Sequence, residues 1–217
     1  MTSPAERTTP LVFVDTNVFY PVRLTDLVLS CVDDGLLDLC VSDHLLNEIE
    51  HVLVERKGLP PAKAKIFRDA IASNAARTVL PADYEASAAR LSGPDPDDLW
   101  HLADAIEAGA TVIVTGNITD FTRARIPDGL VAPQIATPDQ LFAKLIADGL
   151  HDDVLATVAR MSARLKNPPD PGATSSMASP HAGSSHRRRQ NQYRFGTDFT
   201  RHRPGRVTWW QLPWNIL

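Results

Sequence analysis

The residues best suited to chemistry are acidic side chains placed just after predicted strands. Residues 11–14 are all apolar, and Asp15, Thr16 and Asn17 follow them directly. A short apolar run bounded by turn-forming residues is typical of a buried parallel strand. In open α/β sheets ligands bind at the carboxyl ends of strands, so Asp15 is a candidate site residue. The alternative is that Asp15 only caps the following turn together with Thr16 or Asn17.

Three further regions supply carboxylates that could join Asp15. Glu48 and Glu50 lie in the predicted helix after the second strand, Asp98 lies at the start of a later helix, and Asp120 follows the fourth strand. Carboxylate oxygens are the ligands that Mg²⁺ prefers in proteins. A bound divalent cation would therefore give these acids a common role.

Parallel strands end at the same edge of a sheet, which brings the first and fourth strand ends together. We expect Asp15 and Asp120 to approach each other there, with Thr115 and Asn117 beside them. Without a cation such carboxylates repel one another, so at least one pKa should be raised. Asp15→Asn should then leave the metal-free protein equally stable or more stable at pH 7.

Helical geometry, at 100° per residue, distinguishes some of these acids. Around residues 97–108 it places Asp98 beside the apolar face and predicts that Asp97 and Asp104 are solvated. The same test does not separate Glu48 from Glu50, which flank the apolar face of their helix at equal angles.

Four other side chains near the acids could contact a ligand. His101 is predicted to point away from the buried face of its helix, which disfavours a ligand role, and Trp100 is predicted to pack rather than to stack on a base. Arg123 and Arg125 follow Asp120 closely. Either arginine could contact a phosphate.

The elements that position these residues alternate along the chain. The sequence predicts strands at 11–14, 37–41, 78–80, 111–115 and 135–136, and helices at 24–32, 43–53, 61–73, 97–108, 138–147 and 151–166. Alternating strands and helices favour a parallel sheet covered on both faces. The predicted fold class is α/β, with three α/β/α layers and a central sheet of about five short strands.

The amino-acid composition limits which partners and which cellular location are expected for the chain. Residues 1–166 hold 15 Lys/Arg and 24 Asp/Glu, so bulk electrostatics do not favour nucleic acid binding by this region. Cys31 and Cys40 are predicted to be buried, reduced thiols. No apolar run approaches the ~18 residues of a membrane span, and no secretion signal opens the sequence, so we expect a cytoplasmic protein.

Three regions are predicted along the chain. Residues 1–9 are a flexible N-terminus, residues 10–169 form the folded domain, and residues 170–217 form a low-complexity basic tail. The tail holds 7 Lys/Arg and 2 Asp/Glu and has no apolar periodicity, which predicts disorder despite tryptophans at 209, 210 and 214.

Taken together, four segments of the chain resemble the PIN-domain ribonucleases, and among them the VapC-type toxins of bacterial toxin–antitoxin pairs. The segments are Val-Asp-Thr-Asn at 14–17, Leu-Leu-Asn-Glu-Ile at 45–49, Asp-Leu-Trp-His-Leu-Ala-Asp-Ala at 98–105, and Val-Ile-Val-Thr-Gly-Asn-Ile-Thr-Asp-Phe at 112–121. Their order and spacing carry the resemblance, which covers about residues 10–169.

The resemblance implies a set of site residues. The acidic positions of the family fall on Asp15, Glu48, Asp98 and Asp120, which selects Glu48 over Glu50. Some PIN proteins place the fourth acid at the position of Asn117 instead.

The same resemblance implies supporting roles for residues near the acids and also shows one departure from the family pattern. Thr16, Asn17 and Thr115 would orient the carboxylates, with Asn117 beside them. Asp104 departs from the pattern, because a small apolar residue is expected there.

The implied activity is hydrolysis of RNA phosphodiester bonds with Mg²⁺ or Mn²⁺ held by the four acids. The toxin resemblance further implies a homodimer and a small cognate antitoxin protein as partner. One alternative is a PIN-like module that binds protein without catalysis. A less favoured one is a haloacid-dehalogenase-type phosphatase, which requires a second aspartate where this chain has Asn17.

Overall fold

The computed structural model describes residues 8–166, so the predictions for the outermost N-terminus and for the 170–217 tail lie outside the described residues. Its centre is one sheet of five parallel strands in the order β3-β2-β1-β4-β5. This confirms the predicted α/β class with a short five-stranded sheet. The strands are β1 (Leu11–Val14), β2 (Asp38–Ser42), β3 (Arg77–Val79), β4 (Val112–Val114) and β5 (Gln134–Ala136).

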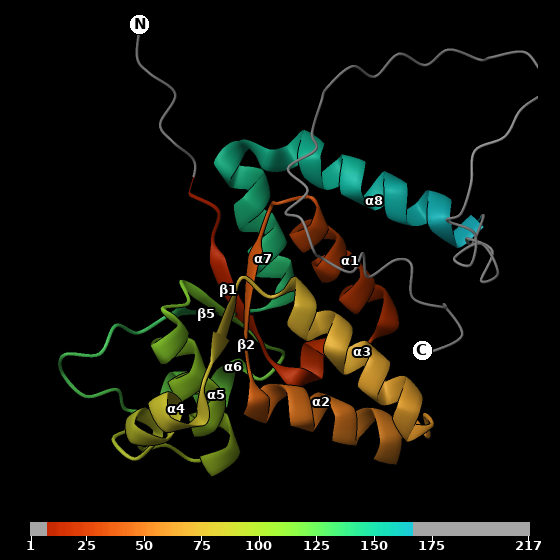
Figure 1. Ribbon diagram of the computed structural model, residues 1–217. Helices are drawn as coiled ribbons and strands as arrows, with labels where there is room; N and C mark the ends of the chain where they lie inside the picture. The colour runs from red at the N-terminus through yellow and green to blue at the C-terminus, as the bar shows by residue number, and fades with distance from the viewer. Residues whose placement is uncertain (1–7, 167–217) are drawn as a thin grey trace, which may run out of the picture.

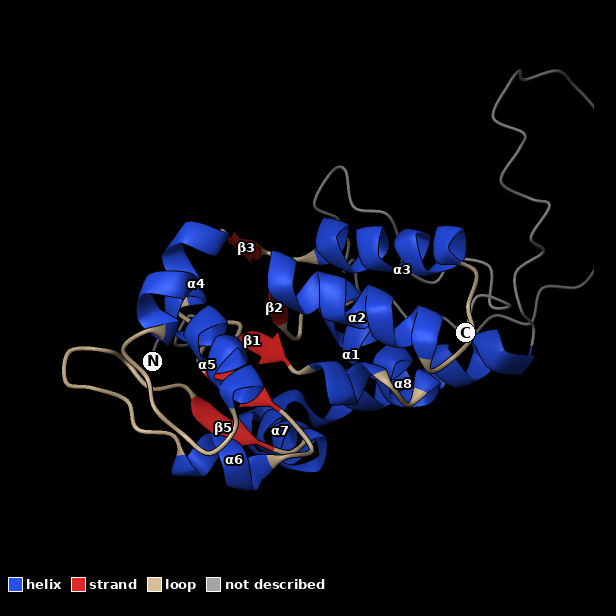
Figure 2. Ribbon diagram, turned by 90° about the horizontal axis from the view of Figure 1, so that it is seen from below, coloured by secondary structure: helices blue, strands red, loops and turns tan. Residues whose placement is uncertain are grey.

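Helices cover both faces of the sheet (Figures 1 and 2). In Figure 2, α4 and α5 lie on one side of the strands, and α1, α2, α3 and α8 lie on the other. The helices are α1 (Val22–Asp33), α2 (Asp43–Glu55), α3 (Pro61–Asn74), α4 (Pro81–Ala88), α5 (Pro96–Ala108), α6 (Ile118–Arg123), α7 (Pro138–Leu145) and α8 (His151–Lys166). A short 3-10 helix, η1 (Thr16–Phe19), follows β1, and a π-helical turn, η2 (Ile146–Leu150), joins α7 to α8.

The central strands form the core because they are apolar on both faces. Phe13 of β1 is paired with Cys40 of β2 and with Ile113 of β4, and all three side chains are fully buried. Burying both faces of a sheet is what near-continuous apolar strands require. The strand order reverses between β1 and β4, and this switch point is where ligands bind in open α/β folds.

The helix ends next to this edge are fixed by local side-chain chemistry. Ser42 ends β2 and caps α2, accepting a hydrogen bond from the Leu45 amide at 3.1 Å. Asp95 caps α5 through the Asp97 amide, and Pro96 occupies its first turn. Gly109 ends α5 with a φ of 67°, a conformation that glycine adopts without strain.

The structure differs from the sequence prediction at a few elements. The sequence did not predict α4 or α6, which are eight and six residues long and too short for a clear apolar period. The predicted helix over 138–147 ends at Leu145, and the chain then turns at Gly149, whose φ is 89°.

Two other predictions about the chain can be compared with the structure. Cys31 and Cys40 are buried free thiols, as predicted, and burial raises the pKa of each to about 12. Within residues 8–166, no helix has both the length and the apolar character that a membrane span requires.

Candidate active site

Asp15 lies at the switch point, held between the ends of β1 and β4. Its backbone amide donates to the Val114 carbonyl at 3.0 Å, which continues the pairing of the two strands. Its side chain is only 4% exposed. Oδ2 of Asp15 accepts hydrogen bonds from the Thr115 hydroxyl, at 2.6 Å, and from the Asn17 amide. The carboxylate therefore has a fixed orientation at the carboxyl edge of the sheet.

Asn17 and Thr115 join the two strand ends around that carboxylate. The Asn17 side chain donates to the Thr115 hydroxyl at 3.1 Å and accepts from the Gly116 amide at 2.9 Å. The Thr115 hydroxyl also accepts a hydrogen bond from the backbone amide of Asn117 at 2.9 Å. A Cβ on Gly116 would lie 3.4 Å from the Asn17 side-chain oxygen, so this turn leaves little room for a side chain.

Asn117 links two of the other predicted acids. Its side-chain amide donates to Asp98 at 3.2 Å and to Asp120 at 2.8 Å. Partial burial, followed by the charges of Asp15 and Asp95, raises the pKa of Asp98 to about 6. The structure thus brings Asp98 and Asp120 together beside Asp15, with the two positions considered for the fourth acid, 117 and 120, in direct contact.

Glu48 rather than Glu50 faces the site, which resolves the choice that helical geometry left open. Oε2 of Glu48 accepts a hydrogen bond from the Thr16 hydroxyl at 2.9 Å. Glu50 instead lies 3.5 Å from Nε of Arg68, on the side of α2 that faces α3. Thr16 therefore positions Glu48 much as Thr115 positions Asp15.

His101 is the residue that the sequence analysis placed wrongly. It is buried, at 3% exposed, and not turned away from the site. Nδ1 of His101 lies 3.2 Å from Oδ1 of Asp15, and Nε2 lies 2.8 Å from Oε2 of Glu48. Burial opposes the imidazolium charge, but contacts with the two carboxylates outweigh burial and raise the pKa of His101 to about 10. The protonated ring thus lies between two of the predicted site acids.

This histidine changes the electrostatics expected at Asp15. Burial alone would raise the pKa of Asp15, but His101 and the Thr115 hydroxyl together lower it below its usual value. Burial and His101 oppose each other in the same way at Glu48, and the pKa of Glu48 is also lowered. The expectation that repulsion dominates at Asp15 is therefore wrong. Among these acids the raised pKa belongs to Asp98, where partial burial comes first and the charges of Asp15 and Asp95 add to it.

Asp104 was predicted to be solvated, and this prediction is wrong as well. The side chain is fully buried, and its Oδ2 accepts from the Ser42 hydroxyl at 2.5 Å. Burial raises the pKa of Asp104 to about 7, against the opposing effects of Ser42 and His101. The prediction assumed a single buried face on α5, whereas α5 packs against the sheet and also against α4.

The ligand atoms of the site fall into three overlapping groups that could hold a cation. In each group the candidate atoms lie within 4.8 Å of one another: Asp95 with Asp98 and Asp120, Asp15 with Asp98 and His101, and His44 with Glu48 and His101. The carboxylate-rich groups suit a hard divalent cation, whose charge would offset the partial burial and the neighbouring negative charges that raise the pKa of Asp98. Asp95 was overlooked as a site residue because its position before Pro96 identified it only as a loop residue.

Arg123 and Arg125 lie beside the acids in sequence and are exposed. Within the described residues, no hydrogen bond or ion pair joins either side chain to the acids. A contact with a substrate phosphate stays a prediction for both.

Comparison with known proteins agrees with the fold. The family model of the PIN domain matches residues 11–119, which is half of the chain. The chain therefore belongs to the PIN-domain family, whose fold is of the nuclease type. The matched segment contains Asp15, Glu48 and Asp98 and ends one residue before Asp120. A search among curated proteins gave no significant match.

Proposed function

We propose that this protein is a metal-dependent endoribonuclease that hydrolyses RNA phosphodiester bonds. The observation that carries the proposal is the convergence of acids from four separate segments at the β1/β4 switch point. Asp15 follows β1, Glu48 lies on α2, Asp98 on α5 and Asp120 on α6. Membership of the PIN-domain family supports the same activity.

A divalent cation, Mg²⁺ or Mn²⁺, is the cofactor in this proposal. Asp15, Asp98 and Asp120 would hold it, with Glu48 nearby, because these side chains supply the oxygen donors that hard cations prefer. When bound, such a cation lowers the pKa of a coordinated water and neutralises charge on a scissile phosphate.

The surrounding residues of the chain orient the acids for that role. Thr115 and Asn17 fix Oδ2 of Asp15, and Thr16 fixes Oε2 of Glu48. The side-chain amide of Asn117 donates hydrogen bonds to both Asp98 and Asp120, which offsets the repulsion between the two carboxylates. Hydrogen bonds of this kind commonly set ligand orientation in metal sites. Arg123 and Arg125 are the candidates for contact with the phosphates that flank the scissile bond.

We further propose that the protein acts as the toxin of a toxin–antitoxin pair, as its motifs suggest by their resemblance to VapC-type toxins. The partners would then be cellular RNA, a second copy of the chain and a small antitoxin protein that covers the acidic site. An arginine of the antitoxin would be suited to the paired carboxylates of Asp98 and Asp120.

The decisive test is cleavage of end-labelled single-stranded RNA by the purified full-length protein. Cleavage should require Mg²⁺ or Mn²⁺ and stop with excess EDTA. Asp15→Asn should abolish it, whereas Asp128→Asn, which changes an exposed loop acid, should cleave as the parent does. Cleavage that persists in EDTA would refute the metal-dependent mechanism. A folded protein that binds Mn²⁺ without cleaving RNA would favour the non-catalytic binding module.

A further inference from the structure

One group of potential ligands lies beside the acids and contains nitrogen donors. His44 and Glu48 occupy positions i and i+4 of α2, so both side chains lie on one face of that helix. His101 approaches the same point from α5, and candidate atoms of all three residues lie within 4.8 Å of one another. This donor set differs from the acids proposed for catalysis, which offer oxygen alone.

We propose that His44, Glu48 and His101 form a second metal site, selective for a transition-metal dication of the Zn²⁺ class. Imidazole nitrogen favours Zn²⁺ and its neighbours, whereas Mg²⁺ favours oxygen ligands. Two histidines and one carboxylate with an open fourth position are a known donor set for Zn²⁺. The proposal concerns a site separate from the all-oxygen one, although the two share the Glu48 side chain.

The spacing of the donors is close to what such an ion requires. Metal–nitrogen bonds of about 2.0–2.1 Å put the centres of two rings bound to one tetrahedral ion ~5 Å apart. The His44 and His101 ring centroids are 5.4 Å apart, in an edge-to-face arrangement. Nε2 of His101 is already 2.8 Å from Oε2 of Glu48. Only small side-chain adjustments separate this arrangement from a closed site.

The two carboxylate contacts of the buried His101 are poorly aligned for hydrogen bonding, which leaves room for another ligand. Although both ring nitrogens of His101 lie near carboxylate oxygens, neither makes a well-aligned hydrogen bond within the described residues. A buried polar atom without an aligned partner costs free energy, and such atoms commonly mark an ion site. An ion at the His44–Glu48–His101 group would take the place of the proton on Nε2 of His101, which is released to solvent on binding, while Nδ1 keeps its proton and its contact with Asp15.

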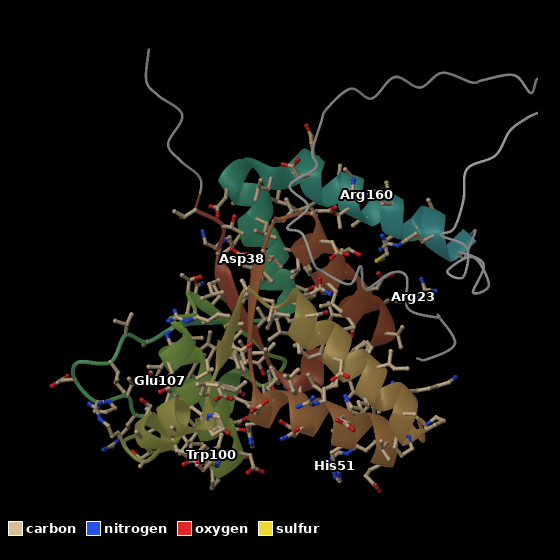
Figure 3. The ribbon with its side chains drawn as sticks, in the orientation of Figure 1. Arg23, Asp38, His51, Trp100, Glu107 and Arg160 are labelled. Carbon is tan, nitrogen blue, oxygen red and sulfur yellow. The ribbon has the colours of Figure 1, made fainter. Side chains whose placement is uncertain are left out.

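Two aromatic residues pack around His44 on one side of the same point. The His44 ring lies 6.0 Å from the Trp100 ring and 6.4 Å from the Tyr84 ring, by their centroids. Trp100 lies at the N-terminal part of α5 (Figure 3), and Tyr84 packs edge-on against it. These ring contacts restrict the orientation of the His44 side chain, and residues around a metal ligand commonly orient it in this way.

The test is direct metal binding by the full-length protein, without RNA. We expect Co²⁺, a spectroscopic substitute for Zn²⁺, to give an intense visible absorption that Zn²⁺ abolishes and excess Mg²⁺ does not. His44→Ala should lower Zn²⁺ affinity at least about tenfold, as the loss of a supporting ligand commonly does. His51→Ala is the matched control, since His51 is an exposed histidine on the same helix (Figure 3), and it should bind Zn²⁺ like the parent.

Two results would overturn the proposal. One is a folded His44→Ala protein, checked by circular dichroism, that binds Zn²⁺ as tightly as the parent. The other is a parent protein whose Co²⁺ spectrum shows only the weak absorption of an all-oxygen octahedral site.

A regulatory consequence follows if the proposed nuclease activity holds. Zn²⁺ bound at this site would engage Glu48, so Zn²⁺ should inhibit Mn²⁺-supported cleavage in the parent and in His51→Ala. His44→Ala should need at least about tenfold more Zn²⁺ for the same inhibition, and equal inhibition of all three proteins would exclude this coupling. The binding experiment stands whether or not RNA is cleaved, so failure of one proposal is distinguishable from failure of the other.

Discussion

Asp98 and Asp15 are neighbours, yet their surroundings shift their pKa values in opposite directions. Asp98 has a folded-state pKa of about 6, above its ordinary value of 3.8, so the folded protein holds a proton there that the unfolded chain releases. Stability is therefore lost as the pH rises from about 4 to about 6. Asp98→Asn should raise the free energy of unfolding of the metal-free protein at pH 7. Because Asp98 is partly exposed, screening limits the gain to about 1 kcal/mol or less. Urea denaturation in EDTA measures it.

Asp15 should respond in the opposite way. Its pKa is lowered, so its ionised form stabilises the fold above the ordinary value near 4, and this contribution is lost as the pH falls below it. Asp15→Asn removes the charge next to the buried His101 ring and should cost about 2–4 kcal/mol at pH 7. The measurement is urea denaturation of both asparagine variants in EDTA. A more stable Asp15→Asn protein would show that repulsion among the carboxylates outweighs His101.

Asp104 makes the fold sensitive to pH at a position remote from solvent. The pKa of Asp104 is about 7 in the folded protein and 3.8 in the unfolded chain. Between these pH values the unfolded chain loses the proton and the folded protein keeps it, so the free energy of unfolding falls as the pH rises. Asp104→Asn keeps an acceptor for Ser42 without the buried charge, so it should stabilise the protein at pH 8 by about 1–3 kcal/mol. The gain should nearly vanish at pH 4. Denaturation curves at both pH values test this, with exposed Asp97→Asn as the control. An equal effect at both pH values would mean that Asp104 does not titrate in this range.

The sequence was informative about individual residues where one element determines their position. Asp15 was identified because it directly follows a buried strand, and Asp98 because it lies beside the apolar face of its helix. His101 and Asp104 were misplaced because they lie on the side of α5 that contacts the strand ends and α2, where His101 meets Asp15 and Glu48 and Asp104 meets Ser42. Apolar periodicity does not reveal a buried face that carries polar side chains. A histidine three residues after Asp98, and so on a neighbouring part of the helix surface, was the available signal.

At the scale of elements, Ser42 connects α2 to α5 through one hydroxyl. It accepts from the Leu45 amide as the N-cap of α2 and donates to Asp104 of α5. Ser42→Ala should cost about 2–3 kcal/mol, because it removes a cap and also leaves a buried carboxyl without its donor. Thr137→Ala removes only the capping box of α7 and should cost about 1 kcal/mol. Thermal or chemical denaturation compares them, and equal losses would show that the Ser42–Asp104 bond adds nothing.

Strands and helices with a clear local sequence pattern were predicted most accurately. All five strands were located to within a residue or two, because each is short and followed by a turn or a helix, and because β1 and β4 are wholly apolar. The cap at Ser42 and the proline that opens α3 also marked helix starts correctly. The weak points were α4 and α6, whose few turns carry too few apolar residues to define a face.

At the scale of the whole molecule, the last described helix is attached to the first. In Figure 1, α8 lies across α1. Two arginines of α8 contact acids in the N-terminal half of α1 and just beyond its C-terminal end. Arg164 donates to the buried Asp26 at 3.0 Å, and Arg160 donates to Asp34. Val154 and Thr157 of α8 are also buried. The folded unit therefore extends well past residue 119, where the match to the PIN-domain family ends.

This arrangement predicts different outcomes for two truncations. A chain that ends at Pro169 keeps α8 and should retain the thermal midpoint of the full chain, because residues 170–217 lack the apolar pattern that could offset the entropy of ordering them. A chain that ends at Leu150 loses α8, and Asp26 is left buried without Arg164. That loss should cost about 3–5 kcal/mol and lower the midpoint by about 10 °C or more.

Differential scanning calorimetry of the three proteins in EDTA distinguishes the possibilities. Arg164→Met separates the ion pair from the rest of the helix, since methionine keeps the apolar contacts of α8 while Asp26 loses its contact with Arg164. The midpoint of this variant should fall between those of the two truncations. If the chain ending at Pro169 melts well below the full chain, residues 170–217 contribute to the folded unit. The tryptophans at 209, 210 and 214 would then be the first to replace with alanine, because tryptophan has the largest side chain in that region and three of them lie within six residues.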